Sequence, residues 1–218
     1  MTQFLPIFPL NIVVFPQEGL NLHIFEPRYI QLINDCIRTQ KPFGIPTMMN
    51  GQVQERGALM HVTEQSQGFD ADGQMGESGG DIRTNGVSTF RILEIVKTVP
   101  DKMYQGAIVH MDERERGELP SIPSQLLALI RTLHGLLNIE KKFSLPDPEL
   151  RSFDVAHHLG LSLEEEYNLR ELPEERQRQE FIRRHLGRVL PTLQAMEQLK
   201  ERARLNGHFR PLSGQSID

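Results

Sequence analysis

A serine inside a glycine-rich string is the residue that best fits a known nucleophile pattern. The string Gly76–Gly80 reads GESGG and matches G-x-S-x-G, with Ser78 at the nucleophile position. That chemistry requires a strained strand-to-helix turn, a histidine base and an acid that orients the histidine. No helix is predicted after Gly80, and no histidine of the sequence stands in a partner motif. The string is therefore interpreted as a chance match, and the sequence predicts no catalytic residue.

Acidic and imidazole groups that could bind a metal ion lack the required spacing. Asp70, Asp72 and Asp81 lie close together, but an EF-hand frame that begins at Asp70 has no glycine at its obligatory glycine position. His157 and His158 are adjacent on a predicted helix, so their side chains point about 100° apart. The sequence therefore predicts no metal site and no cofactor.

The single cysteine and the absence of phosphate-binding motifs exclude further classes of protein. Cys36 allows no disulfide within the chain, and its place on the apolar face of a predicted helix favours a small buried residue. Neither G-x-x-x-x-G-K-[ST] nor G-x-G-x-x-G occurs, so nucleotide hydrolysis is not expected. No signal peptide or membrane span is predicted, and a cytoplasmic location is the simplest expectation.

Polar-tipped and apolar side chains gather where a predicted strand meets a predicted helix. A strand end and a first helical turn cannot bury so many polar groups without matching partners, so some of these groups face outward. Two methionines that end the next predicted strand suit a surface accepting varied sequences. The candidate partner-binding residues are His23, Phe25, Glu26, Arg28, Tyr29, Met48 and Met49. Two alternatives stay open: Glu26 and Arg28 pair with each other, or Arg28 and Tyr29 hold the junction together.

Charge is shared unequally along the chain, whose formal net charge is -5. Residues 170–210 hold ten Lys and Arg against six Glu. The net acidity argues mildly against a nucleic-acid protein, whereas the basic stretch keeps RNA binding open. Glu174, Glu175 and Glu180, which lie beside and within the Arg-rich stretch Arg176–Arg188, favour a solvated helix face with i,i+4 pairs.

The 218 residues fit one large domain or two small ones, and the first half has the pattern of a β-rich domain. Short apolar runs alternate with Gly, Pro and Asn, and one helix is expected to begin at Pro27. Between two of the predicted strands, the glycine-rich stretch 68–80 is expected to be a mobile loop. The predicted strands are 4–10, 11–15, 20–25, 43–48, 57–64, 81–87, 89–96 and 104–111.

After residue 118 the apolar period changes to 3.6, which predicts a small helical bundle. Helices are expected near Pro123, from Asp147 to Gly160, and from the capping box at Ser162. A last helix starts at Pro173 and is expected to kink or split at Pro191. The predicted division is a β-rich subdomain at 1–117, a helical subdomain at 118–210 and a frayed tail at 211–218.

Strings in the first half of the chain carry a family resemblance. They are Leu5-Pro-Ile-Phe-Pro-Leu10, Val14-Phe-Pro16, Leu20-Asn-Leu-His-Ile-Phe-Glu-Pro-Arg-Tyr29 and Gly86-Val-Ser-Thr-Phe-Arg-Ile-Leu93. In this order they resemble the Lon N-terminal (substrate-binding) domain family, over roughly residues 4 to 200. The resemblance implies an α+β fold: an N-terminal β-rich, PUA-like pseudobarrel with one embedded helix, followed by a small C-terminal α-helical bundle.

The resemblance also implies a function. The implied function is that of a non-catalytic module that binds unfolded or specific protein segments, alone or with a protease or chaperone assembly. The ATPase and Ser-Lys peptidase motifs of Lon protease do not occur, so a stand-alone module is expected. The alternatives are an RNA-binding PUA-like protein and a structural adaptor subunit of a larger assembly. Three departures from the family pattern stand out: the long loop 68–80, Thr89 in place of a basic residue, and Pro191.

Overall fold

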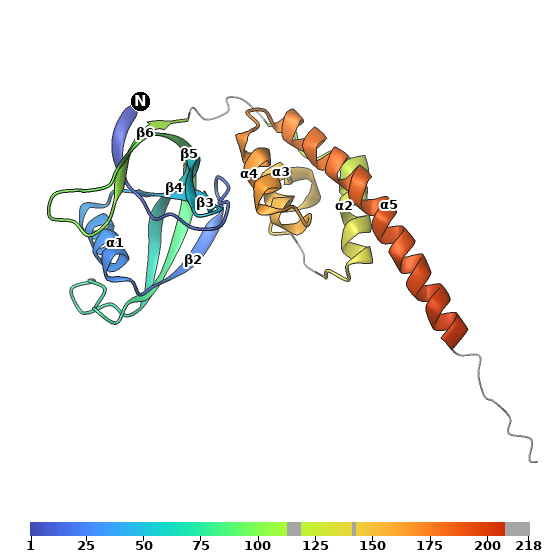
Figure 1. Ribbon diagram of the computed structural model, residues 1–218, viewed down its shortest axis with the longest axis horizontal. Coiled ribbons are helices and arrows are strands. Elements are labelled where there is room, and N and C mark those ends of the chain that lie inside the picture. The colour runs from blue at the N-terminus through green and yellow to red at the C-terminus, as the bar shows by residue number, and fades with distance from the viewer. Residues whose placement is uncertain (113–118, 141–142, 208–218) are drawn as a thin grey trace, which may run out of the picture. The chain divides into compact units, whose positions relative to one another are not determined.

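The structure is a computed structural model that describes residues 1–112, 119–140 and 143–207. The chain divides into two compact units, whose strands and helices are drawn in Figure 1. The first unit combines residues 1–117 with 161–171, and the second combines 118–160 with 172–218. The segment 161–171 thus groups with the first unit, although the sequence placed it in the helical subdomain. The tail 211–218 lies outside the described residues.

Six strands form one antiparallel sheet in the first unit, in the order β1-β6-β5-β4-β3, with β2 paired to β5. They are β1 (Thr2–Pro6), β2 (Gly19–Ile24), β3 (Phe43–Met49), β4 (Gln52–Gln67), β5 (Gly80–Val96) and β6 (Gly106–Met111). Parallel bridges join Ile7 to Gly44 and Leu10 to Thr47, so the chain after β1 meets the opposite edge strand, β3. The sheet is thereby closed into a small barrel, and the chain is of the α+β class.

Three of the predicted strands, 11–15, 81–87 and 89–96, do not form as separate strands. The predicted strands 81–87 and 89–96 form the single strand β5, which continues through a register shift between Ile92 and Glu94. The segment 11–15 forms no strand, although the side chain of Phe15 is only 1% exposed. Gly86 allows this segment to approach β5 closely, because a Cβ there would lie 2.8 Å from the Phe15 carbonyl oxygen. The glycine lets the irregular segment lie against the middle of β5.

Strand β4 separates two apolar clusters, as its alternating sequence predicted. Ala58 and Met60 face the cluster covered by helix α1 (Pro27–Thr39), whereas Leu59 packs in the cluster on the other face of the strand. Cys36 of α1 is 4% exposed in the first cluster, and burial raises the pKa of its thiol to about 12. Cys36 is therefore a small buried core residue, as expected.

Helix α4 (Leu163–Glu171) is the part of the second half that belongs to the first unit. The predicted capping box is present. The Ser162 backbone amide donates to the Glu165 carboxylate at 2.9 Å, and the Glu165 amide donates to the Ser162 hydroxyl at 3.2 Å. Two free amides at the helix start are satisfied in this way, and α4 ends at Glu171 as the sequence predicted.

The described residues of the second unit form two long and three short helices. They are α2 (Ser124–Leu136), η1 (Asp147–Glu149), α3 (Ser152–Val155), η2 (Ala156–His158) and α5 (Glu175–Gly207). The single helix predicted from Asp147 to Gly160 is thus wrong. Helix α5 continues through Pro191 instead of splitting there. Pro191 and Gly187 are both exposed, so the carbonyl that loses its partner is open to water.

Candidate functional site

The junction of β2 and α1 presents the clearest exposed aromatic side chain of the first unit. Ile24 points into the core at 1% exposure, and the next residue, Phe25, is 64% exposed. The imidazole of His23 stacks on the Phe25 ring at 6.0 Å between centroids, and its Nδ1 lies 2.7 Å from Asp81 Oδ1. The alternation of β2 therefore places His23 outside and Ile24 inside, and leaves Phe25 open to a partner.

Glu26 and Arg28 pair with each other, which is one of the alternatives left open by the sequence. Arg28 donates through Nε and Nη2 to Glu26 Oε2, at 2.9 and 2.7 Å. Both side chains are about half exposed, and the Glu26 carboxylate makes no cap bond to the helix. Exposed pairs of this kind contribute roughly 0–1 kcal/mol, so a ligand can displace either partner at little cost.

Tyr29 belongs to the core rather than to the surface. It is 8% exposed, and its ring centroid lies 4.0 Å from that of Phe8. The Arg28 guanidinium lies 4.5 Å from the Tyr29 ring centroid. Burial raises the pKa of the Tyr29 hydroxyl. The sequence placed Tyr29 among the partner-binding residues because its hydroxyl is polar, but the ring is held inside by packing.

Met103 extends the exposed surface beside α1, and the sequence analysis missed it. Gln31 lies one turn after Arg28 on the helix. Its Nε2 donates to the Asp101 carbonyl at 3.2 Å, and its Oε1 accepts from the Met103 amide at 2.7 Å. The Met103 side chain is 59% exposed. We call His23, Phe25, Arg28 and Met103 the helix-start surface.

Met48 and Met49 do not join the helix-start surface. Met48 pairs with Val53, at the beginning of the 16-residue strand β4. The end of β2 lies by contrast at Gly80 and Asp81, and Asp81 pairs with Gln67 at the other end of β4. Both methionines are half-buried. The register therefore separates the two groups that the sequence analysis combined.

The glycine-rich loop next to the helix-start surface is anchored to α1. Asn34 exchanges two hydrogen bonds with the backbone of Met75, at 3.0 and 2.8 Å, and the Met75 side chain is 4% exposed in the core. The Asp70 carboxylate accepts from the amides of Asp72 and Gln74 at 3.0 and 2.9 Å. Asp70 and Asp72 thus stabilise a turn. In the described part of the chain, no group of three potential ligands is placed to hold a metal ion.

Ser78, His23 and Asp81 are the three residue types of a hydrolase triad, and the loop brings them into one region. The His23–Asp81 bond is present, but Ser78 forms no hydrogen bond to His23 in the region that the structure describes. His23 is 64% exposed, so water competes for its free nitrogen. Strand β5 rather than a helix follows the string. The geometry therefore lacks the serine–histidine bond and the elbow that acyl transfer requires.

A second polar cluster holds α4 against the barrel. Arg56 of β4 pairs with Asp112 at 2.6 Å and with Glu171 at 2.9 Å, and Thr89 donates to Asp112 at 2.7 Å. Arg170 is 6% exposed and donates to the Arg56 carbonyl at 3.1 Å. Burial lowers the pKa of Arg170 and raises that of Glu171. Thr89, where the family pattern has a basic residue, thus orients the acceptor of Arg56.

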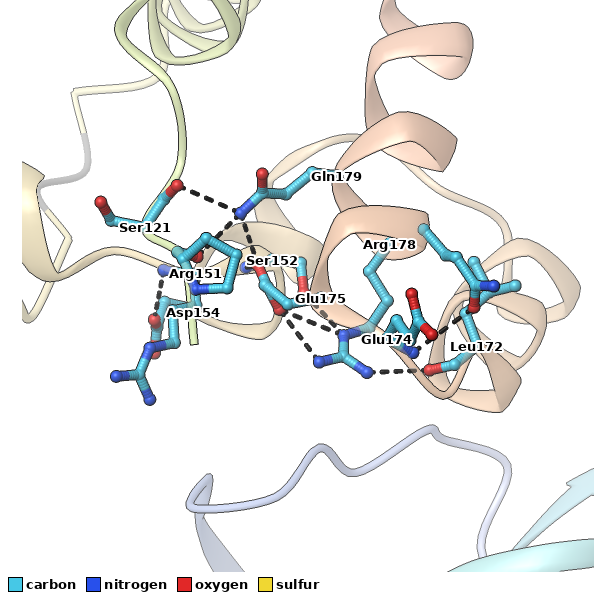
Figure 2. A network of polar contacts seen from close by, with 11 residues as sticks. Ser121, Arg151, Ser152, Asp154, Leu172, Glu174, Glu175, Arg178 and Gln179 are labelled. Carbon is cyan, nitrogen blue, oxygen red and sulfur yellow. Dashed lines mark hydrogen bonds and ion pairs between the residues drawn. The ribbon is translucent and has the colours of Figure 1, made fainter. Parts of the chain in front are cut away.

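A third polar cluster lies inside the second unit (Figure 2). Glu175 is 1% exposed, and its carboxylate accepts from the Ser152 amide and hydroxyl at 2.8 and 2.7 Å. It also accepts from Arg178 at 3.1 Å and from Gln179 at 2.9 Å. The Arg178 guanidinium lies 4.5 Å from the Phe153 ring centroid. These groups are buried and bonded to one another, so the cluster stabilises the unit and offers no open position to a ligand.

Comparisons with known proteins complete the description. The family model for the ATP-dependent protease La (LON) substrate-binding domain matches residues 4–188. Lon protease 2 of Myxococcus xanthus is 28% identical over 138 residues, which are 62% of this chain and 17% of that protein. This chain therefore spans only a small part of that relative.

Two solved structures share the fold. A Lon N-terminal domain protein from Xanthomonas campestris has a TM-score of 0.59 and 23% identity, over 82% of this chain and 95% of that one. The N-terminal domain of a Mycobacterium avium complex Lon protease has a TM-score of 0.53 and 13% identity, over 85% and 98%. No helix among the described residues is long and apolar enough to cross a membrane.

Proposed function

Because this chain belongs to the family of the ATP-dependent protease La (LON) substrate-binding domain, we propose that it is a non-catalytic module that binds protein segments at the helix-start surface. The observation that carries the proposal is Phe25, an aromatic ring 64% exposed at a rigid strand-to-helix junction. The exposed Phe25 ring, the exposed and adaptable Met103 side chain and the displaceable Glu26–Arg28 pair together suit binding to varied apolar segments.

A second group of exposed apolar side chains lies on the first unit and provides a matched control. Phe4 and Leu93 are 44% and 55% exposed, on strands β1 and β5. Leu93 lies on β5 beyond Asn85, where the pairing with β2 ends, and so stands apart from the junction of β2 and α1. We therefore assign partner binding to the helix-start surface and use Leu93 as the control position.

The test is binding of fluorescently labelled β-casein, a chain without stable structure, followed by anisotropy. Phe25→Ala is expected to weaken binding about tenfold, since burial of a large apolar side chain contributes ~1.5–3 kcal/mol. Met103→Ala is expected to weaken it less, and Leu93→Ala to leave it unchanged. Equal affinity of the Phe25→Ala and unsubstituted proteins would contradict the proposal. Casein cleavage that is lost in Ser78→Ala would contradict the non-catalytic assignment.

RNA binding receives less support from the basic stretch 170–210. Arg170 and Arg178 are buried, and Arg183 and Arg184 both pair with Glu180 at 2.7 Å. The two buried arginines are out of reach of a phosphate backbone, and Glu180 offsets part of the positive charge of the exposed Arg183 and Arg184, which lowers the attraction for a polyanion. Association with a protease or chaperone assembly, or an adaptor role in a larger assembly, remains compatible with the helix-start surface as the docking site. A native pull-down with the Phe25→Ala variant as control separates these partners from unfolded protein.

A further inference from the structure

A cavity of about 520 Å³ lies in the second unit, beside the end of helix α2. Its volume falls within the range of about 300–1,000 Å³ that is typical of ligand pockets. The walls combine apolar side chains with a few polar groups. The residues that line it are Arg131, His134, Gly135, Ile139, Glu140, Phe143, Leu145 and Asp147.

The end of α2 explains why the cavity exists. Asn138 adopts a left-handed conformation with φ 53°. Its amide donates to the Gly135 carbonyl at 3.3 Å, and the Ile139 amide donates to the His134 carbonyl at 2.9 Å. These are the two bonds of a Schellman motif, which reverses the chain after a helix. Glu140 follows directly and forms part of the wall. A Cβ at Gly135 would meet nothing within 4 Å, so this glycine leaves the space open.

Two polar groups of the cavity wall have no partner among the described residues, and both are hydrogen-bond acceptors. His134 is 7% exposed, and its Nε2 lies 2.9 Å from the His158 carbonyl oxygen, which can only accept. Nε2 therefore carries a proton, so in the uncharged tautomer Nδ1 is an acceptor, and it has no partner among the described residues. Glu140 is exposed and likewise makes no ion pair within the described ranges. Among the described residues of the wall, Arg131 is the one cation, and it is engaged by Asp147.

The apolar part of the wall is aromatic. The Phe143 ring lies 5.5 Å from the His134 ring and 5.9 Å from the His158 ring, measured between centroids. Leu145 lies at the rim and is 40% exposed. An aromatic face attracts a planar cation, and a carboxylate binds a guanidinium through two parallel hydrogen bonds.

We infer that this cavity binds the arginine side chain of a protein segment: the guanidinium donates to Glu140 and to His134 Nδ1, and the aliphatic stem packs on Phe143. A planar guanidinium fits this combination better than the compact ammonium of lysine. The inference rests on the proposed function in one respect only, namely that the arginine belongs to a bound protein segment. The cavity belongs entirely to the second unit, whereas the helix-start surface belongs to the first.

The test is a titration of the full chain with the peptide acetyl-Ala-Leu-Arg-Leu-Ala-amide, observed by NMR at the histidine ring signals. The expected result is a saturable shift of the His134 and His158 signals. The same peptide with citrulline, a neutral isostere of arginine, is expected to bind at least tenfold more weakly. Glu140→Gln is expected to weaken the arginine peptide about tenfold. Equal affinity for both peptides, or saturation without any shift of these two histidines, would overturn the inference.

A pair of glycine variants provides the structural control. Gly135→Leu fills the cavity without removing a contact and is expected to abolish binding. Gly187→Leu places the same side chain at another open helical glycine, in α5, and is expected to bind normally. Binding that survives Gly135→Leu would overturn the assignment to this cavity.

Free arginine amide distinguishes the source of the ligand. It is expected to bind at least tenfold more weakly than the peptide, whereas equal affinity would mean a small-molecule site and overturn the protein-segment assignment. The Phe25→Ala variant is expected to bind the arginine peptide normally, because Phe25 lies in the other unit. Failure of this inference and failure of casein binding are therefore observed separately.

Discussion

In the barrel, ion pairs such as Arg28–Glu26, Arg83–Glu64 and Arg91–Glu55 lie at the surface with both partners more than 40% exposed. In the helical unit, Glu175 and Arg178 form an ion pair whose side chains are 1% and 5% exposed. The two units differ because their backbone amides find hydrogen-bond partners in different ways. Strands satisfy one another's amides, whereas a four-residue helix such as α3 cannot satisfy its own.

Glu175 supplies what α3 lacks. It accepts the amide of Ser152, the first residue of α3, and Arg178 then compensates the charge that this brings into the interior. The helical unit therefore holds α3 through a few buried polar bonds, whereas in the first unit strand pairing satisfies the sheet, and the bonds of Arg56 and Arg170 serve to hold α4. Two substitutions and a change of pH test this contrast, in order of decreasing expected effect.

Arg178→Ala leaves the Glu175 carboxylate buried without its cation. We expect this to destabilise the helical unit by about 3–5 kcal/mol, measured by urea unfolding followed by circular dichroism. Arg183→Ala removes an exposed partner of Glu180 and is the control, with an expected effect below about 0.5 kcal/mol. Alkylation of Cys36, which lies in the barrel core, reports separately on the barrel. Faster alkylation in Arg178→Ala would mean that the two units do not differ in the way described.

Asn34→Ala removes both hydrogen bonds that anchor Met75. Each contributes about 0.5–1.5 kcal/mol, so we expect a loss of about 1–3 kcal/mol, confined to the loop. Limited proteolysis is expected to cut first within Gly68–Gly80 in the unsubstituted protein and to cut there faster in the variant. Gln54→Ala, which loses one exposed bond within β4, is the control. A first cut within 120–190 in the unsubstituted protein would show that the helical unit is the weaker one.

Acidification is expected to give the smallest effect. Hydrogen bonds from Arg183 and Arg184 lower the pKa of Glu180 from 4.5 to about 2. A carboxyl group whose pKa is lowered in the folded state stabilises that state above its ordinary pKa, and this contribution is lost as pH falls from about 4.5 towards 2. The N-terminal part of α5 should lose protection from hydrogen exchange in this range. Glu180→Gln should show a smaller dependence on pH, and an identical profile in both proteins would refute the assignment.

The sequence predicted those elements whose signals are local. The capping box at Ser162, the start of α1 at Pro27 and the alternation of β4 were confirmed, because each depends on residues within a few positions of one another. The segment 11–15 was not predicted correctly. Val13, Val14 and Phe15 are buried, as they would be in a strand. The segment packs closely against Gly86, however, which is distant in the sequence.

The candidate site shows the same limit. The exposure of Phe25 and Arg28 was expected because both lie at one short strand-to-helix junction of the chain, whereas the exposed Met103 was not considered because Gln31 brings it to α1 from a distant loop. Tyr29 was misplaced because residue type does not tell on which side of the helix a ring packs. The cavity beside α2 had no local signal apart from Asn138, which can adopt the left-handed conformation that ends the helix.

The return of the chain to the barrel at α4 has a consequence for biosynthesis. Tyr167 and Arg170 bond to Arg56 across 111 and 114 residues of sequence. At a synthesis rate of ~5–20 residues per second, roughly 6–23 s separate Arg56 from these partners on the ribosome. During that time the polar groups of Arg56 are without α4, and the intervening helical segment emerges first. The barrel is therefore expected to reach its final state only after α4 has been synthesised, although its strands come first in the sequence.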